Sequence, residues 1–337
     1  MRRKLPAVLV CLAGAALALA SGAAGGTGGL APEDPVTPGA GDIEQIYFLL
    51  SVIGAVVLLV VVVPLATFVV RSRGRGRSRE EEGPQVRGNT RLEVAWTLVP
   101  VVLVAIIIGF VVYKAPGIEL SDQASARDTL SIDVEGRRYY WQYVYPNGVV
   151  GIDRLRVPAG ETVNLDLTAW EGDVIHSFWV PALGGKFDAV PGQTQDFTFR
   201  ATKLGVYEGV CGEFCGIQHS AMGVQVEVME REAFGDWLAR EGEAQRAGDS
   251  DLGEQEWEGV CSKCHRLAGQ GEPSIGPNLG ATQLRNAESI AAIVRNGQSS
   301  MPPVGGGWSD RQMDALTTYL SKELAPRVED GGGTDGG

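Results

Sequence analysis

Two long apolar runs constrain this chain more than any other feature of its sequence. The first extends from Ile46 to Val70 and the second from about Val94 to Val112. An α-helix needs roughly 20 apolar residues to cross the hydrocarbon core of a bilayer. The first run in particular is too long and too continuously apolar for an ordinary buried helix. The sequence therefore predicts a two-helix transmembrane hairpin over residues 42–117, with helices at about 46–70 and 94–112.

Arginines between the two runs predict the orientation of this hairpin. They are Arg71, Arg73, Arg75, Arg77, Arg79, Arg87 and Arg91. Loops rich in Lys and Arg stay in the cytoplasm. Both ends of the hairpin are therefore expected on the outer side of the membrane. Pro100 lies within the second run and is tolerable there, because a membrane bundle can satisfy the carbonyl that a proline frees.

Residues 1–24 have the pattern of a secretory signal peptide. Three basic residues precede an apolar run from Leu5 to Ala20, and the small residues Ala18 and Ala20 form a plausible cleavage site. Cleavage there would remove Cys11. Lipid modification of Cys11 is the weaker interpretation, because the three residues before it lack the small side chains that such processing requires.

From about Asp128 to Val228 the sequence changes to short runs rich in Val, Tyr, Thr and Phe, separated by turns that contain Pro, Gly and Asn. This pattern is typical of a β-sandwich or barrel. Strict alternation at 205–211 and at 223–229 predicts two strands that bracket one short loop. That loop carries the first of two motifs with metal chemistry.

Cys211, Cys215, His219 and Met222 recur at short spacing in this loop. Soft sulfur and borderline nitrogen donors select copper over hard ions such as magnesium. A mononuclear copper site needs one thiolate and the second can bridge, so the loop predicts a binuclear copper centre with His176 supplying the second imidazole. The alternative is a disulfide between Cys211 and Cys215, as extracytoplasmic cysteines often form, but it leaves His219 and Met222 unexplained.

The second motif is Cys261-Ser-Lys-Cys264-His265. A C-x-x-C-H sequence is the attachment signature of a c-type haem, in which two thiols hold the porphyrin and the imidazole binds the iron. Redox dithiols and half zinc sites share the C-x-x-C part, but no second cysteine pair follows Cys264, so zinc would lack ligands. The two motifs and His176 account for the three histidines of the chain.

A sixth iron ligand is expected some tens of residues after the haem motif. Met301 lies in a proline-rich segment suited to pointing a thioether at the iron, and we predict it as the ligand. Met313 is the alternative. It shares one helical face with Leu316 and Leu320, which predicts a role in core packing instead.

Taken together, these motifs resemble subunit II of haem–copper cytochrome c oxidases with a cytochrome c domain fused at the C terminus, as in caa-type oxidases. The resemblance covers nearly the whole chain. It implies the dinuclear copper centre CuA, bridged by Cys211 and Cys215 and completed by His176 and Met222 on one copper and by His219 and the carbonyl of Glu213 on the other. It also implies that the Glu213 carboxylate reaches a magnesium ion at the interface with subunit I.

The expected fold class is thus a multidomain membrane protein. The transmembrane hairpin is followed by an all-β cupredoxin-like barrel at 127–232 and an all-α class I cytochrome c domain at 252–325. Residues 233–251 are charged and alanine-rich, and we predict a short helix followed by a linker. The acidic, glycine-rich residues 326–337 are expected to be a disordered tail.

Three further residues take candidate roles from the resemblance. Glu93, in the stretch Glu93-Val-Ala-Trp-Thr-Leu-Val-Pro, would lie near the entrance of a proton path; the alternative is that its side chain only extends to water.

Tyr139 occupies the position where many family members carry a tryptophan that accepts electrons from soluble cytochrome c, and Trp141 retains a second tryptophan. Both are electron-entry candidates. For Tyr140 and Tyr143, packing within the barrel is at least as good an interpretation.

The resulting hypothesis is an electron-entry subunit. Cytochrome c or another donor would reduce haem c, then copper, and electrons would reach a haem–copper subunit I that reduces oxygen to water. The chain itself lacks the helices and histidines of an oxygen-reducing site, so it would contribute to a proton-translocating enzyme without a catalytic residue of its own. Its partners would be subunit I, other oxidase subunits, the donor and the bacterial cell membrane, with copper and haem on the outer face, and no nucleic acid.

The net charge of −12 is compatible with attraction of a basic donor or with a merely solubilising surface. Two other functions remain open from sequence alone. One is the electron-input subunit of a haem–copper nitric oxide reductase. The other is a membrane-tethered electron carrier or copper-assembly protein that docks transiently.

Overall fold

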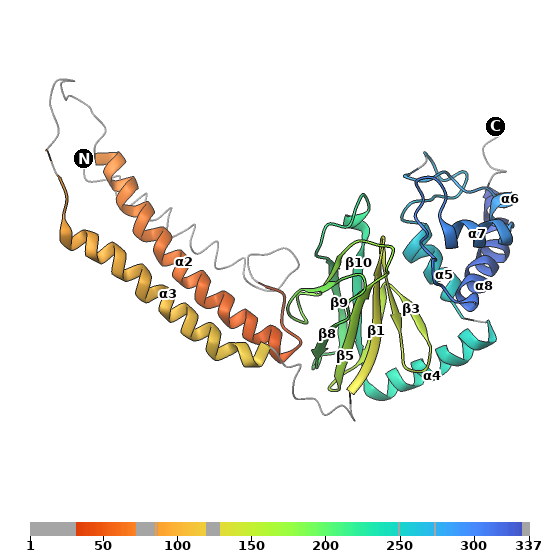
Figure 1. The fold of residues 1–337 in the computed structure, drawn as a ribbon, viewed down its shortest axis with the longest axis horizontal. Helices are drawn as coiled ribbons and strands as arrows, with labels where there is room; N and C mark the ends of the chain where they lie inside the picture. The colour runs from red at the N-terminus through yellow and green to blue at the C-terminus, as the bar shows by residue number, and fades with distance from the viewer. Residues whose placement is uncertain are drawn as a thin grey trace, which may run out of the picture. The chain divides into compact units, whose positions relative to one another are not determined.

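The computed structural model describes residues 32–71, 85, 87–118, 129–248, 250–272 and 274–331. The chain divides into two compact units, one containing residues 38–119 and the other residues 120–337 (Figure 1). The predicted signal peptide, residues 1–24, and most of the arginine-rich segment lie outside the described residues.

The first unit contains two helices, α2 (Pro38–Arg71) and α3 (Thr90–Ile118). Each is long and apolar enough to cross a membrane by length and composition, and its apolar side chains are exposed. Lys114 near the end of α3 pairs with Asp42 near the start of α2, with Nζ and Oδ1 2.8 Å apart. The two helices therefore run antiparallel, as a hairpin requires.

Both helices are longer than the apolar runs that predicted them. For α3, a suitable N-terminal cap lets the flanking residues continue the helical backbone. Asn89 precedes α3 and its Oδ1 accepts the amides of Arg91 and Leu92, which satisfies donors that the first turn leaves open. The extra turns thus extend the helices beyond 46–70 and 94–112 without changing the hairpin.

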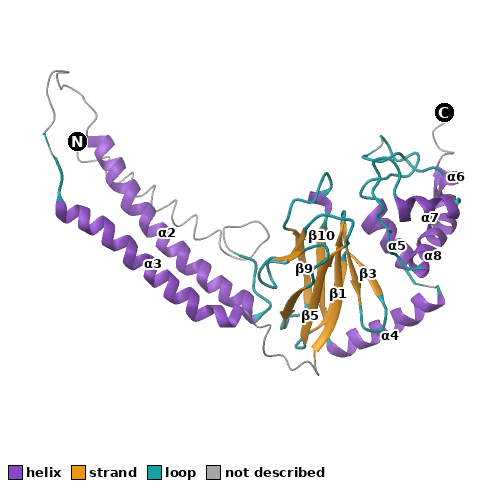
Figure 2. Cartoon of the chain, viewed as in Figure 1, coloured by secondary structure: helices purple, strands orange, loops and turns teal. Residues whose placement is uncertain are grey.

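The second unit begins with two sheets of five strands each in the described residues (Figure 2). One has the order β3-β2-β1-β5-β8 and the other β4-β10-β9-β6-β7. The pairs β1–β5 and β10–β4 are parallel and the other pairs are antiparallel. The strand bounds are β1 (Thr129–Arg137), β2 (Tyr140–Val144), β3 (Val150–Ile152), β4 (Arg154–Pro158), β5 (Thr162–Ala169), β6 (His176–Trp179), β7 (Phe187–Ala189), β8 (Gln195–Phe199), β9 (Gly205–Cys211) and β10 (Gly223–Met229).

Alternating side chains fill the core between these sheets. In β5, every second residue is buried, so Val163, Leu165 and Leu167 face inward while the polar residues between them face outward. Trp141 packs edge-on against Phe178 from the opposite sheet, with ring centroids 5.4 Å apart. The all-β prediction is confirmed, and the strands predicted at 205–211 and 223–229 have those bounds.

Helix α4 (Arg231–Ala247) follows β10 and corrects the predicted linker. Most of residues 233–251 form one continuous helix, because an apolar stripe holds it to the barrel. The ring of Trp237 lies 5.2 Å from that of Tyr145, and Phe234 is buried beside them. Gly248 ends the helix in a left-handed conformation, with φ of 79°.

The C-terminal domain is helical. It contains α5 (Leu252–Glu256), the π-helical turn η3 (Trp257–Cys261), α6 (Ala281–Leu284), α7 (Ala287–Asn296), α8 (Asp310–Tyr319), the π-helical turn η4 (Leu320–Leu324) and α9 (Ala325–Gly331). Its core gathers Leu252 from α5, Leu316 from α8 and Leu320 from η4. This arrangement agrees with the predicted all-α domain.

Helix α9 shows that the predicted disordered tail is wrong over residues 326–331. The helix persists because Val328 packs against the domain core and Glu329 pairs with Arg285, whose Nη2 lies 2.8 Å from Glu329 Oε2. Residues 332–337 lie outside the described part of the chain.

Gly253 provides a test of the packing in the C-terminal domain. A Cβ at this position would overlap the carbonyl oxygen of Ala315 and lie 2.8 Å from Tyr319 Cβ, so Gly253 allows α5 to cross α8 closely. We expect Gly253→Ala to lower the free energy of unfolding of this domain by about 1–3 kcal/mol, the usual cost of overpacking. The midpoint of chemical denaturation, followed by tryptophan fluorescence, measures it.

The matched control is Gly235→Ala in α4, where no atom lies within 4 Å of the added Cβ. Alanine is the better helix former, so this change should leave stability equal or raise it by about 0.5–1 kcal/mol. Equal effects of the two substitutions would contradict the close crossing.

Candidate functional site

The loop between β9 and β10 is closed by backbone hydrogen bonds at its base. Cys211 is the last residue of β9, Met222 precedes β10, and the amide of Cys211 donates to the carbonyl of Met222 at 2.9 Å. The 3₁₀ turn η2 (His219–Ala221) brings His219 back toward the strand ends. The local sequence therefore folds so that residues eleven apart face each other across a narrow loop.

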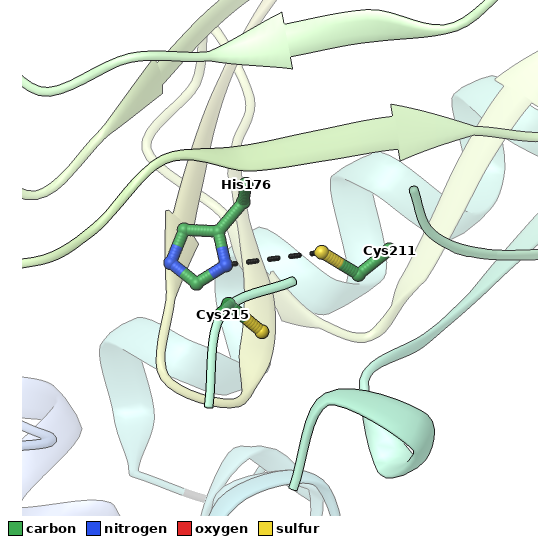
Figure 3. A group of neighbouring side chains, drawn as sticks. All are labelled: His176, Cys211 and Cys215. Carbon is green, nitrogen blue, oxygen red and sulfur yellow. Dashed lines mark hydrogen bonds between the residues drawn. The ribbon is translucent and has the colours of Figure 1, made fainter. Parts of the chain in front are cut away.

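Two sulfurs and an imidazole meet beside this loop (Figure 3). His176 begins β6, which pairs with β9 at Phe178 and Cys211. The Nδ1 atom of His176 lies 3.9 Å from Cys211 Sγ. The ligand atoms of His176, Cys211 and Cys215 lie within 4.8 Å of one another, and all three residues are buried. These residues form a possible metal site.

The other residues predicted in this site surround the same sulfurs. Cys215 Sγ lies 3.6 Å from His219 Nδ1 and 3.8 Å from Met222 Sδ. Cys211 Sγ lies 3.2 Å from the carbonyl oxygen of Glu213. The structure thus brings all six predicted ligand groups together. Cys211 and Cys215 are free thiols and form no disulfide.

Hydrogen bonding shifts the pKa values of the two thiols in opposite directions. A hydrogen bond from Cys215, aided by one from His176, lowers the pKa of Cys211 to about 3. The same pair interaction, with burial, raises the pKa of Cys215. Two adjacent buried thiolates repel each other, so only one is stable without a cation. The donor set therefore suits a metal that two thiolates share.

Asp173 fixes the surroundings of His176. Burial alone would raise the pKa of Asp173, but the nearby imidazole of His176 and the hydrogen bonds from Arg138 lower it to about 2. Its Oδ1 lies 2.6 Å from Arg138 Nε and 3.7 Å from His176 Nε2. Burial would lower the pKa of His176, but the nearby Asp173 carboxylate and Cys211 thiol outweigh that effect and raise it. Carboxylates of this kind orient ligand imidazoles.

The carboxylate of Glu213 pairs with a lysine. Its Oε2 lies 3.6 Å from Lys186 Nζ, and the carboxylate is half-exposed. The backbone carbonyl of Glu213 contacts Cys211 Sγ, so the two roles that the resemblance implies for this residue fall to different atoms. A magnesium site at the carboxylate stays a prediction.

An exposed apolar rim surrounds the loop and was not anticipated. Phe214 and Ile217 are 77% and 73% exposed, and Trp179 on β6 is 40% exposed. Such a concentration beside a buried polar cluster is typical of a protein interface. The sequence signal was weak, since single apolar residues in a loop are common.

The electron-entry candidates lie in different surroundings. Trp141 is fully buried in the barrel, with its ring 6.1 Å from the His176 ring. Tyr139 is partly exposed, and its hydroxyl would lie 2.5 Å from a Cβ at Gly216. Tyr143 packs in the barrel core as expected, whereas Tyr140 packs in the core of the C-terminal domain.

The haem motif forms a tight turn at the end of η3. The amides of Cys264 and His265 both donate to the carbonyl of Cys261, at 3.0 and 2.9 Å. The Nδ1 atom of His265 lies 2.9 Å from the carbonyl oxygen of Pro277. A Cβ at Gly276 would lie 2.5 Å from the imidazole, so only glycine leaves room for this ring. Nδ1 is thus engaged as a donor, and Nε2 is the nitrogen suited to binding iron.

The two candidate methionines differ in burial. Met313 on α8 is 4% exposed and belongs to the core of the C-terminal domain. Met301 is partly buried at the edge of that core, in a turn where its amide donates to the carbonyl of Gln298. This difference favours Met301, whose role as an iron ligand stays a prediction.

Glu93 is exposed in the first turn of α3, where its Oε1 accepts the amide of Asn89 at 3.3 Å. Its proton role is likewise untested.

Comparison with protein families divides the second unit at α4. Residues 149–229 match the family described as cytochrome c oxidase subunit II, periplasmic domain, and residues 248–320 match that described as cytochrome c oxidase, cbb3-type, subunit III. The first match contains every residue of the cysteine cluster, and the second contains the haem motif and Met301.

Two curated relatives extend the similarity over most of the chain. Cytochrome c oxidase subunit 2 of Alkalihalophilus pseudofirmus is 34% identical over 85% of this chain and 89% of its own. The protein of the same name from Thermostichus vulcanus is 33% identical over 69% and 85%. Among solved structures, the periplasmic domain of subunit II of cytochrome oxidase from Bradyrhizobium japonicum is 28% identical, covers 36% of this chain and 98% of its own, and has a TM-score of 0.34.

Glu256 gives a test of electrostatics beside the haem motif. Its carboxyl is fully buried, and neither oxygen has a hydrogen-bond partner in the described residues. Burial raises its pKa well above the usual value, so the folded state holds a proton that the unfolded state releases above about pH 4.3. Stability should therefore fall as pH rises through the neutral range.

We expect Glu256→Gln, which keeps the size and cannot ionise, to flatten this pH dependence and to raise the melting temperature at pH 8. Thermal denaturation of the full chain between pH 5 and 8 measures it. Equal slopes for wild type and variant would contradict the assignment.

Proposed function

Because the chain belongs to the cytochrome c oxidase subunit 2 family, whose members are components of haem–copper oxidases, we propose that it is the electron-entry subunit of a membrane-bound oxygen reductase. Electrons from cytochrome c or another donor would enter at the C-terminal domain, pass to the cysteine loop of the barrel and leave toward the catalytic subunit. The gathering of four further donor groups around the two buried thiols is the observation that carries this proposal.

The donor set fits the dinuclear copper centre CuA. The residues that would hold it are Cys211, Cys215, His176, His219, Met222 and, through its carbonyl, Glu213. Such a centre supplies one-electron transfer when bound. The protein's contribution is a fixed ligand frame, because Cys211 and His176 stand on paired strands and Met222 closes the loop. Rigid ligands limit rearrangement between oxidation states.

The haem motif fits a covalently attached haem c. Cys261 and Cys264 would hold the porphyrin, and His265, with its ring oriented by Pro277, and Met301 would bind the iron. Gly276 contributes by leaving space for the imidazole. No residue of this chain would reduce oxygen, so the catalytic step belongs to the partner.

The remaining parts support attachment to a membrane and to other subunits. Helices α2 and α3 would anchor the chain in a bacterial cell membrane, with the second unit on the outer face. The apolar rim of Phe214 and Ile217 would contact the catalytic subunit. The half-exposed Glu213 carboxylate beside that rim could then share a magnesium ion with it.

The metal content of the purified complex tests the proposal. We expect two coppers and one covalent haem c per chain, with an electron paramagnetic resonance signal from an electron shared by both coppers. Cys215→Ser removes one bridging sulfur and should abolish that signal. A single copper with a mononuclear signal in wild type would instead support a tethered carrier, and turnover of nitric oxide without oxygen would support a nitric oxide reductase.

Two methionines provide a matched comparison. Met222 lies 3.8 Å from Cys215 Sγ, whereas Met229 lies at the far end of the same strand pair. Met222→Leu should retain copper and alter its absorption and resonance spectra, because one weak ligand is lost. Met229→Leu should leave both spectra unchanged. Equal spectra for the two variants would remove Met222 from the proposed ligand set.

Glu93 is proposed to lie at the entrance of a proton path. Glu93→Gln keeps the size of the side chain and removes its proton exchange. We expect slower turnover and slower proton uptake by the assembled complex, with copper and haem content unchanged. Unaltered proton uptake would leave Glu93 as a surface residue that extends to water.

A further inference from the structure

The haem motif is joined directly to the barrel through Lys263, the residue between Ser262 and Cys264. Its ammonium lies 2.5 Å from Asp153 Oδ2 and donates to the carbonyl of Tyr139 at 2.8 Å. The Lys263 side chain is only 13% exposed and that of Asp153 24%. Charge-assisted bonds with little access to water are stronger than those between exposed groups.

A second bond joins the haem motif to the cysteine loop itself. The side-chain amide of Gln218 donates to the carbonyl oxygen of Lys263. Gln218 precedes His219, and Lys263 precedes Cys264. A continuous path of covalent bonds and one hydrogen bond therefore connects a proposed copper ligand with a proposed haem attachment site.

Strand β2 holds the other side of the C-terminal domain. The hydroxyl of Tyr140 donates to Val304 at 2.6 Å and accepts from Trp308 Nε1 at 2.9 Å. Gln312 donates to Gln142 at 3.0 Å. These contacts fix the segment that follows Met301, and the buried Arg137 also donates to the carbonyl of Gly306 in it.

Asp153 is prepared for its contact with Lys263. Its other carboxylate oxygen accepts the amide of Trp141 at 2.9 Å, and Gly259 brings η3 close, because a Cβ there would lie 2.5 Å from Ile152 Cγ2. The amide of Ile152 donates to Gln255 of α5. Ile152 and Asp153 thus contact the haem-motif side of the domain.

We infer that the C-terminal domain is a docked, immobile electron donor, in which Lys263 is the positioning residue and the Gln218–Lys263 bond is the electron route to the cysteine loop. The inference rests on the proposed function.

Hydrogen–deuterium exchange of the full chain in its complex tests the docking. In wild type the amide of Ile152 should exchange slowly. Lys263→Met removes a hydrogen-bonded charge, and loss of such a bond should speed exchange of residues 150–153 about tenfold or more. Lys322→Met, an exposed lysine of the same domain, is the control and should change nothing. Fast exchange in wild type, or no effect of Lys263→Met, would overturn the inference.

Electron transfer from haem to copper, followed by absorbance after photoreduction, tests the route. Gln218→Leu should slow it at least several-fold while exchange at 150–153, the reduction potentials and the copper signal stay unchanged. Gln225→Leu on β10 is the matched control and should transfer at the wild-type rate. A wild-type rate in Gln218→Leu would overturn the route.

These outcomes are separable from failure of the proposed function. Absence of copper or haem from the wild-type complex would refute that function. The exchange experiment compares complexes of equal copper and haem content, so it reports on docking separately from electron transfer.

Discussion

The pairing of β9 with β10 is the constraint on which the rest of the site depends. Their ladder runs to Val210 and Gly223, and the next residues along each strand are Cys211 and Met222, already joined through their backbones. The connecting loop is short, so Cys215 and His219 must lie close to the strand ends. A third strand, β6, adds His176 through its pairing with β9. Backbone pairing of the strands thus sets the distance between the two thiols, which repel each other when both are ionised.

Strand β2 serves two cores at once. Trp141 and Tyr143 face the barrel, while Tyr140 and Gln142 face the C-terminal domain, and all four residues are buried. Alternation of side chains in a strand makes this possible, since neighbours point to opposite faces. A strand that would otherwise expose one face to water instead forms the boundary between two domains. Substitutions on β2 will therefore affect the copper surroundings at positions that face the barrel, and the domain contact at positions that face the C-terminal domain.

Helix α4 explains how this boundary is maintained. A flexible connection would let the C-terminal domain sample many positions, and docking on the barrel would then cost conformational entropy. In this chain Trp237 fixes the start of α4 to the barrel, and the amide of Gln245 near its end both donates to and accepts from the backbone of Val150 on the edge strand β3. The helix so covers a sheet edge that would otherwise be open to pairing with other chains. The helix therefore helps to keep the C-terminal domain beside the barrel.

The sequence by itself determined the parts of this protein whose signals are local. Apolar length predicted α2 and α3, strict alternation predicted β9 and β10, and the spacing of Cys211, Cys215, His219 and Met222 specified a soft-donor loop. The identity of His176 followed from the scarcity of histidine. Only the tertiary structure decided which face of β2 meets which core, that residues 233–247 form a packed helix, that α9 continues past residue 325, and that Lys263 reaches Asp153. These outcomes depend on contacts between residues up to 170 positions apart, as for Gln142 and Gln312. No periodicity along the chain encodes such pairs, because their energy exists only once both surfaces are folded.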